Sequence, residues 1–339
     1  MKAACRPNFE ITWVYMRIAV IGAGFCGLSL ALKLLEGGAQ VTIFDGSGIG
    51  GGASGVASGL MHPYPGETCK RSFRAEEGMA ATQELLDQIQ QELGYCVASY
   101  DGIIRYIQTD AQKETLLAHC ETYGDLEQRD AESFWIRSGV TIHSVLYLQA
   151  LWALIEKRRG SFENVQVKNV SELEGYDSIV IAAGAGIAAF PECALLKYQL
   201  TKGQILTAKG PKLLESSVIG KGYVAVGQEA GLYFIGSTYE REYLSEESDL
   251  ELTQLSVLPK IRTFFPEVDQ LEIKGCRAGV RVSRIGHYYP MIGQLSETCW
   301  VFTGMGSRGL LYHAYLAKYI TRAILSQDRS SIWTENFSF

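Results

Sequence analysis

The residues with the clearest chemical meaning are three glycines near the beginning of the chain. Gly22, Gly24 and Gly27 follow the apolar run Ile18–Ile21, and Asp45 ends the next apolar run. In a strand–turn–helix–strand unit, such glycines make the turn, let a pyrophosphate approach the backbone and let the helix pack on the strand. The free N–H groups at the helix N-terminus then bind phosphate, and the acid accepts hydrogen bonds from a ribose. The spacing therefore predicts a dinucleotide-binding site.

The context of this motif separates it from three other matches to the same spacing. Matches to Gly-x-Gly-x-x-Gly also start at Gly46, Gly50 and Gly304, and 36 glycines in 339 residues give roughly 0.4 matches by chance. The matches at Gly46 and Gly50 have no predicted strand ahead and no helix behind. The match at Gly22 ends a strand and opens a helix, and Asp45 follows its last glycine by 18 residues. The alternative interpretation is a glycine turn packed in the core.

Two further glycine-rich segments favour FAD over NAD. Residues 46–59 contain seven glycines among apolar side chains, which suits either a flexible linker or a backbone that passes close to a ligand. Residues 304–309 repeat the glycine spacing before the last predicted helix. A large dinucleotide touched by both ends of the chain fits FAD, and the positive end of that helix would stabilise a reduced flavin. An NAD(P)-dependent dehydrogenase remains the alternative.

Apolar periodicity predicts strand–helix units at both ends of the chain and β-rich segments between them. Helices are predicted at 28–35, 75–93, 110–123, 145–158, 250–264 and 310–325. Strands are predicted at 18–21, 40–44, 94–109 with a turn at 101–102, 165–170, 178–183, 203–208, 223–226, 232–235 and 298–302. We expect an α/β protein, with a Rossmann-type FAD-binding domain and an inserted antiparallel or mixed β-sheet substrate domain that is itself α+β. The FAD-binding domain is assigned to 16–93, 140–194 and 276–330, the substrate domain to 94–139 and 195–275, and residues 1–15 stay an unassigned leader.

The composition excludes several classes of protein. Hydrophobic residues make up 47% and charged residues 20% of the chain, which excludes a mainly disordered protein. A net charge of −6 argues against nucleic-acid binding through overall charge. The eight cysteines contain no Cys-x-x-Cys pair, the five histidines have no metal-ligand spacing, and no apolar stretch reaches the roughly 20 residues of a membrane span. We therefore expect a cytoplasmic protein with no metal site and no membrane contact.

Several of these motifs together carry a family resemblance. The chain resembles the FAD-dependent amino-acid oxidase (DAO) family, which includes glycine oxidase, sarcosine oxidase and D-amino-acid oxidase, over roughly residues 16–327. Within the family, residues 277–281 and 306–310 are most similar to the FAD oxidase domain of the bifunctional enzymes that make 5-methylaminomethyl-2-thiouridine in tRNA, followed by glycine oxidase. The segments that carry the resemblance are 22–27 with Asp45, 53–63, 176–185, 236–240, 278–281 and 290–293.

The resemblance implies which residues contact the substrate. Arg281 matches the family's carboxylate-binding arginine, and a guanidinium group can hold a carboxylate through two parallel hydrogen bonds. If residues 277–282 form a strand, Arg277 lies on the same face. Tyr223 matches an aromatic side chain placed over the substrate. We predict all three as catalytic residues; the alternatives are surface ion pairs for the arginines and core packing for the tyrosine.

The resemblance also implies which residues hold FAD. They lie in the two glycine turns, in the glycine-rich loop and at the ends of neighbouring strands. His62, beside the expected flavin face, is interpreted as a loop histidine rather than a point of covalent attachment. The predicted FAD-binding residues are Gly22, Gly24, Phe25, Cys26, Gly27, Asp45, Ala53, Ser54, Gly59, Leu60, Met61, Val167, Ala183, Gly184, Gly304, Gly306, Ser307, Arg308, Gly309 and Leu310.

The activity implied by the resemblance is oxidation of the C–N bond of an amino acid or a carboxymethyl secondary amine, with the flavin as electron sink. One form of this hypothesis is a modified tRNA carrying 5-carboxymethylaminomethyluridine (cmnm5U), with lysine and arginine clusters at 70–74 and 197–212 to bind RNA. Another is a free glycine, sarcosine or D-amino-acid oxidase or dehydrogenase. A non-catalytic FAD-binding protein is a third alternative. The electron acceptor is either O2 or an unknown partner.

Overall fold

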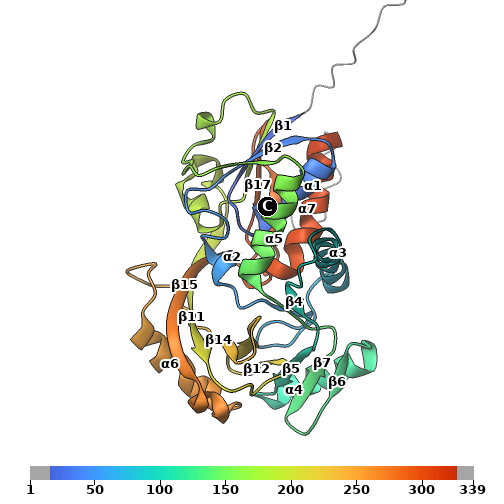
Figure 1. Cartoon of the computed structure of the whole chain (residues 1–339), viewed down its shortest axis with the longest axis vertical. Helices are drawn as coiled ribbons and strands as arrows, with labels where there is room; N and C mark the ends of the chain where they lie inside the picture. Colours follow the sequence, from blue (N-terminus) through green and yellow to red (C-terminus); the bar gives the residue numbers. More distant parts are fainter. Residues whose placement is uncertain (1–15, 327–339) are drawn as a thin grey trace, which may run out of the picture.

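The computed structural model of the chain describes residues 16–326. The predicted leader at 1–15 and the last residues of the predicted FAD-binding domain, 327–330, lie outside these described residues. The described chain forms one six-stranded, one eight-stranded and one three-stranded sheet. Figure 1 shows the six-stranded sheet with its helices in the upper half and most of the eight-stranded sheet in the lower half.

The six-stranded sheet has the topology expected of a Rossmann-type unit. β1 lies in its centre and pairs in parallel with β2 on one side and β10 on the other, and only the edge strand β16 is antiparallel. Apolar side chains alternate between two cores because the sheet is covered on both faces. The sheet order is β16 (Met291–Gln294), β17 (Cys299–Thr303), β10 (Ser178–Ile181), β1 (Arg17–Ile21), β2 (Gln40–Phe44) and β9 (Ser161–Glu163).

Four helices enclose the larger of these two cores. They are α1 (Phe25–Glu36), α3 (Ala75–Leu93), α5 (Ser144–Lys157) and α7 (Gly309–Ser326), and each contributes buried apolar side chains to one cluster with β1 and β2. α1 and α7 pack against each other beside the sheet (Figure 1). The other face of the sheet is covered by the short 3-10 segments η1 (Val170–Glu172), η2 (Gly184–Ala189) and η3 (Pro191–Cys193).

The eight-stranded sheet is mixed and mostly antiparallel. Its two longest strands, β11 and β15, run from the lower half of the molecule toward the six-stranded sheet (Figure 1). One face packs on α6 (Leu250–Arg262) and η4 (Pro266–Gln270), and part of the other face packs on α4 (Asp110–Thr122). The sheet order is β15 (Glu272–Arg284), β11 (Tyr198–Lys209), β14 (Leu232–Gly236), β13 (Tyr223–Val226), β12 (Ser217–Ile219), β5 (Ile103–Tyr106), β7 (Ser133–Ile136) and β6 (Leu126–Gln128).

The remaining elements link the two larger sheets. β3 (Leu60–Met61), β8 (Val140–Ile142) and β4 (Ala98–Ser99) form the three-stranded sheet, and the short helix α2 (Ala53–Val56) lies against β15. The predicted domain boundary at residue 276 falls within β15, so the division into domains stays a prediction. None of the helices between residues 16 and 326 combines the length and apolarity of a membrane span.

The α/β class and the inserted β-sheet are as predicted, but one predicted strand is wrong. Residues 165–170 do not join a sheet, and the chain pairs with β2 earlier, at Ser161–Glu163. The Asn169 side chain accepts the Ser171 N–H at 2.9 Å, and Glu172 closes a capping box, so the segment turns into η1. The alternating pattern of the segment was therefore misleading, because local capping competes with strand pairing.

Candidate cofactor and substrate site

The first glycine turn has the geometry of a phosphate cradle. Gly22 has a φ of +112°, and a Cβ there would overlap the backbone carbonyl that follows β10. A Cβ at Gly27 would overlap the Gly22 carbonyl. α1 starts with Gly24 as N-cap and has no side-chain cap of its own; the Phe25 N–H donates to Ser54 Oγ at 3.1 Å. The open N-terminus of α1 therefore offers N–H groups and the positive end of a helix dipole to an anion.

Asp45 lies beside this turn. It follows β2, and its Oδ2 accepts the Ala23 N–H at 2.8 Å. Its Oδ1 accepts the Ser47 N–H at 2.8 Å. Each carboxylate oxygen retains a free lone pair, so the side chain can still accept a ribose hydroxyl.

The glycine-rich loop passes close to three parts of the structure. The Gly50 N–H donates to the Ala23 carbonyl at 2.9 Å, which joins the loop to the first turn. A Cβ added to Gly279 of β15 would lie 2.9 Å from Ala53 Cα, so α2 rests almost on the strand backbone. Gly59 has a φ of +87°, and a Cβ there would overlap the Ile142 carbonyl. The loop is thus fixed by backbone contacts, which argues against a flexible linker.

The second glycine turn reaches the same region from the other end of the chain. Gly304 and Gly306 have φ values of +77° and +54°, and the Gly306 N–H donates to the Val282 carbonyl of β15 at 2.8 Å. α7 then begins at Gly309, where a Cβ would stand 3.5 Å from a ring carbon of Phe25. The N-termini of α1 and α7 therefore lie close together.

A buried histidine fixes the first turn of α7, and sequence reasoning missed it. His313 Nδ1 lies 3.0 Å from the Gly309 carbonyl, and Nε2 lies 2.7 Å from the Tyr147 hydroxyl. Burial lowers the pKa of His313 to about 4, so the imidazole is neutral at pH 7. Because a carbonyl can only accept, Nδ1 donates to Gly309 and Nε2 accepts from Tyr147. Neither residue stands in a motif that could have indicated this contact.

The other predicted FAD-binding residues lie around the two turns. Ala183 follows β10, with its Cα 3.1 Å from the position of a Cβ on Gly22, and Gly184 has a φ of +54°. Val167 is buried in the core on the face of the six-stranded sheet that η1, η2 and η3 cover. Of the rest, Cys26, Leu60, Met61, Arg308 and Leu310 are partly or fully buried and Ser307 is exposed.

Arg281 presents an unsatisfied cation on the inner face of β15. Its Nη2 is buried and has no hydrogen-bond partner, and none of the ion pairs among residues 16–326 includes it. The residue paired diagonally on β11 is Gly203, where a Cβ would lie 2.7 Å from this Nη2. The Tyr239 ring centroid lies 6.0 Å from the guanidinium carbon. A half-buried arginine with a buried, unpartnered Nη2 and no acid partner is suited to a carboxylate ligand.

Arg277 lies on the same strand face, but its contacts differ. Its Nη1 donates to the Gly55 carbonyl at 3.2 Å, and its guanidinium stands 5.0 Å from the centre of the Phe234 ring. Burial lowers the pKa of Arg277, and its Nε has no partner. This arginine therefore links β15 to the glycine-rich loop, and its buried Nε–H is left for a ligand.

Tyr223 lies near both arginines and the glycine-rich loop. Burial raises the pKa of its phenol, while hydrogen bonds with Ser58 and Ser237 and the charges of Arg281 and Arg277 act in the opposite direction. The hydroxyl therefore stays protonated at pH 7 and can donate to an anion. The structure brings the three predicted catalytic residues together, and it adds the two serines, which the sequence did not indicate.

These residues fit a bound FAD on structural grounds. Two helix N-termini converge, the glycines of both turns allow a close approach to the backbone, and unsatisfied arginine donors face the same interior. Residues 16–326 contain no group of three or more His, Cys, Asp or Glu side chains arranged to hold a metal ion.

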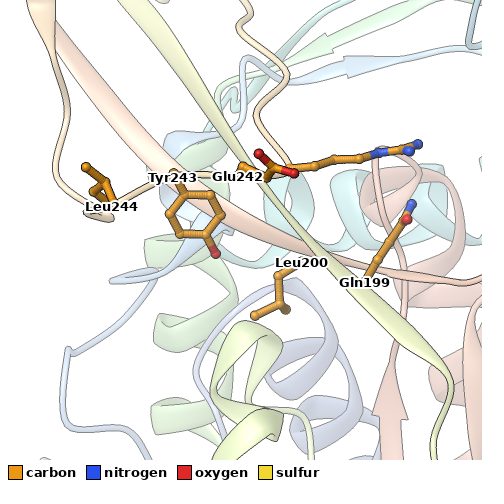
Figure 2. A pocket seen from close by; sticks show the side chains of 6 residues that line it. Gln199, Leu200, Glu242, Tyr243 and Leu244 are labelled. Carbon is orange, nitrogen blue, oxygen red and sulfur yellow. The ribbon is translucent and has the colours of Figure 1, made fainter.

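A hollow lies beside this site rather than in it. It has a volume of about 920 Å³ and is lined by Gln199 and Leu200 of β11 and by residues 241–244. Figure 2 shows Tyr243 and Leu244 on one loop, with Gln199 and Leu200 on the strand beside it. None of the lining residues is a predicted site residue, but the same loop carries Tyr239, which contacts Arg281.

Known proteins resemble this chain in sequence and structure. A family model described as FAD dependent oxidoreductase (DAO) matches residues 17–323. The tRNA 5-methylaminomethyl-2-thiouridine biosynthesis bifunctional protein MnmC of Polaromonas naphthalenivorans is 26% identical over 90% of this chain and 56% of its own length. The glycine oxidase of Bacillus licheniformis is 22% identical over 94% of this chain and 95% of its own.

A solved structure supports the same fold. The glycine oxidase from Geobacillus kaustophilus has a TM-score of 0.80 at 17% identity, over 92% of this chain and 96% of that one. This likeness confirms the predicted fold class. The chain spans about half the length of several of the curated relatives that it matches.

Proposed function

Because this chain belongs to the FAD dependent oxidoreductase (DAO) family, we propose that it oxidises the C–N bond of an amine that also carries a carboxylate. The observation that carries the proposal is the buried, unpartnered Nη2 of Arg281 beside Gly203. A carboxylate held there would complete the hydrogen bonds of a cation that has no acid partner among the described residues. The substrate class is therefore an amino acid or a carboxymethyl secondary amine.

We assign the cofactor residues from the geometry of the two turns. The N–H groups of Gly24, Cys26 and Gly27 and the Ser54 hydroxyl would hold the pyrophosphate of FAD, and Asp45 would accept from the ribose. The N-terminus of α7 at Gly309, fixed by His313, would point its positive end at the flavin. When bound, FAD would supply the acceptor for the hydride removed from the substrate carbon, which carries both electrons of the oxidation.

The chain's own side chains position the substrate. Arg281 holds the carboxylate, which fixes the direction of the amine-bearing carbon. Tyr223 keeps its proton and donates to the same carboxylate, since its phenol has a raised pKa. Arg277 holds the glycine-rich loop against β15 and so acts mainly as a positioning residue.

The finer proposal is that the amine is the carboxymethylaminomethyl group of a wobble uridine in tRNA. It is supported by the similarity to the MnmC protein, which covers 90% of this chain. A free amino acid such as glycine is the second candidate, and it is supported by a similarity that covers 95% of the length of a glycine oxidase. For both candidates the proposed electron acceptor is O2 or an unknown partner.

Anaerobic titration of the FAD-loaded protein tests these proposals. The flavin absorbance near 450 nm is followed while glycine, sarcosine, D-alanine, a carboxymethylaminomethyl nucleoside and tRNA carrying it are added, about 450 nm being the usual flavin maximum. Bleaching by at least one of them is expected. Bleaching by glycine but not by the modified tRNA would contradict the finer proposal. A flavin that none of them bleaches would favour a non-catalytic FAD-binding protein.

A further inference from the structure

One row of paired residues crosses six strands of the eight-stranded sheet on the face that carries the site. Residues directly opposite each other on neighbouring strands point to the same face. The row contains Arg277, Ile205, Gly236, Tyr223, Ile219 and Arg105, on β15, β11, β14, β13, β12 and β5. With strands about 4.8 Å apart, the backbone of Arg105 lies roughly 10 Å from that of Tyr223. Arg105 therefore lies on the same face of the eight-stranded sheet as Arg277 and Tyr223, and we call this face the sheet floor.

Arg105 is a buried cation with unsatisfied donors. The residue is 3% exposed, and the one hydrogen bond of its side chain within residues 16–326 runs from Nη2 to the Gly66 carbonyl at 2.9 Å. Its Nε is buried without a partner. Burial lowers the pKa of Arg105, while Cys69 and the exposed Glu67 act in the opposite direction, and none of the ion pairs in the described chain includes Arg105. Since a buried guanidinium is costly without a counter-charge, its free donors indicate a place for an anion.

The surroundings of His62 show that Arg105 faces the same interior as the cofactor turns. His62 follows β3 and is 8% exposed, and its Nδ1 accepts the Tyr64 N–H at 3.3 Å. Burial and the positive charges of Arg105 and Arg308 lower the pKa of His62 to about 3. Neutral His62 therefore lies near two cations, Arg105 on the sheet floor and Arg308 in the turn before α7.

We propose that Arg105 forms a second anion subsite, so that the preferred substrate is an amine carrying two carboxylates. This rests on the proposed function, in which Arg281 holds the first carboxylate. The second carboxylate binds the free Nε and Nη1 donors of Arg105, on the far side of Tyr223 from Arg277. A substrate with a single carboxylate leaves the charge of Arg105 uncompensated and binds more weakly.

Binding of non-oxidisable analogues to the FAD-loaded protein tests the subsite directly. Oxydiacetate carries two carboxylates, and ethoxyacetate replaces one of them by a methyl group of similar size. Calorimetric titration should give a dissociation constant at least about tenfold lower for oxydiacetate, in line with one charge-assisted hydrogen bond. Arg105→Met should abolish this preference, and Arg129→Met, which alters an exposed arginine on the neighbouring hairpin, should leave it intact.

A matched pair of amines separates this inference from the proposed function. Iminodiacetate and N-ethylglycine differ by the same carboxylate, and their rates of flavin reduction are compared. Equal rates for both amines in the native protein and in Arg105→Met would overturn the second subsite and leave amine oxidation standing. No reduction by either amine, with oxydiacetate still bound through Arg105, would overturn amine oxidation alone.

A conservative variant guards against misfolding of Arg105→Met, which loses the bond to Gly66. Arg105→Lys keeps the charge but loses the forked donors. It should weaken oxydiacetate binding several-fold and leave ethoxyacetate binding unchanged. An equal loss for both ligands would mean that Arg105 only holds the loop at Gly66, and the inference would be wrong.

Discussion

Arg281→Met is the substitution that most sharply tests the proposed substrate site. The methionine fills the space of the arginine stem but carries no charge and no donor. The Nη2 removed is the buried donor that lies against Gly203 and has no partner among the described residues. Because no acid loses its partner, the fold should lose little stability, and the effect should fall on the substrate.

The magnitude follows from the contacts that a carboxylate would make there. Two charge-assisted hydrogen bonds contribute about 1.5–3 kcal/mol each, and leaving a buried charge unpaired costs about 2–5 kcal/mol. We expect Arg281→Met to lose about 3–5 kcal/mol of transition-state stabilisation, which corresponds to a fall in kcat/KM of about 150- to 5,000-fold. An amine without a carboxylate, such as methylamine, should be affected by less than about threefold because it never used the guanidinium.

The assay combines steady-state kinetics with flavin content. kcat/KM is measured with the best amine of the titration panel and with methylamine, and bound FAD is measured from the absorbance of the purified protein. Arg262→Ala is the control, since Arg262 is paired with Asp269 on the far side of the sheet. Native kcat/KM in Arg281→Met, or loss of FAD in proportion to activity, would refute the reasoning.

Two further predictions concern the cofactor turn and pH. Gly24→Val should lose most bound FAD, because even a Cβ would lie 2.8 Å from Ser54 Oγ, whereas Gly52→Val, with nothing within 4 Å of a Cβ, should keep it; normal flavin content in Gly24→Val contradicts the assigned site. The pKa of His62 is lowered from 6.5 to about 3, so the unfolded chain binds the extra proton and stability falls as pH drops below 6.5. In urea unfolding, His62 should make the native protein about 2 kcal/mol less stable at pH 5 than above pH 7. His62→Gln should remove this part of the pH dependence, whereas His287→Gln, at an exposed position, should not. The same dependence of stability on pH in His62→Gln as in the native protein would contradict the prediction.

The parts of the fold that follow local rules were predictable from sequence. The helix at 75–93 ends where it was expected because Gly94 takes a positive φ as C-cap. The first strand–turn–helix unit was predictable because each glycine answers a local steric demand. The strand expected at 165–170 was not, because residues 161–163 and 165–170 are both compatible with an edge strand. The pairing of residues 161–163 with β2 and the capping turn at Asn169 decide which of the two segments becomes the strand. The pairing with β2 exists only in the folded chain, so the sequence could not indicate it.

The site follows a similar division. Arg281, Arg277 and Tyr223 could be named because they stand in segments with a family pattern. Residues that depend on pairing between distant strands could not: Gly203 meets Arg281 through the register of β11 and β15, and Arg105 joins the floor through five successive strand pairings. His313 and Tyr147 meet across 166 residues of sequence, so no local spacing could indicate their contact.

The most direct test of the account is a crystal structure of the FAD-loaded protein with methoxyacetate, a non-oxidisable carboxylate. One FAD is expected, with its pyrophosphate on the N–H groups at the start of α1 and its flavin facing the start of α7 at Gly309. The carboxylate of methoxyacetate should accept hydrogen bonds from Arg281. A dinucleotide bound elsewhere, or a carboxylate that makes no contact with Arg281, would contradict it.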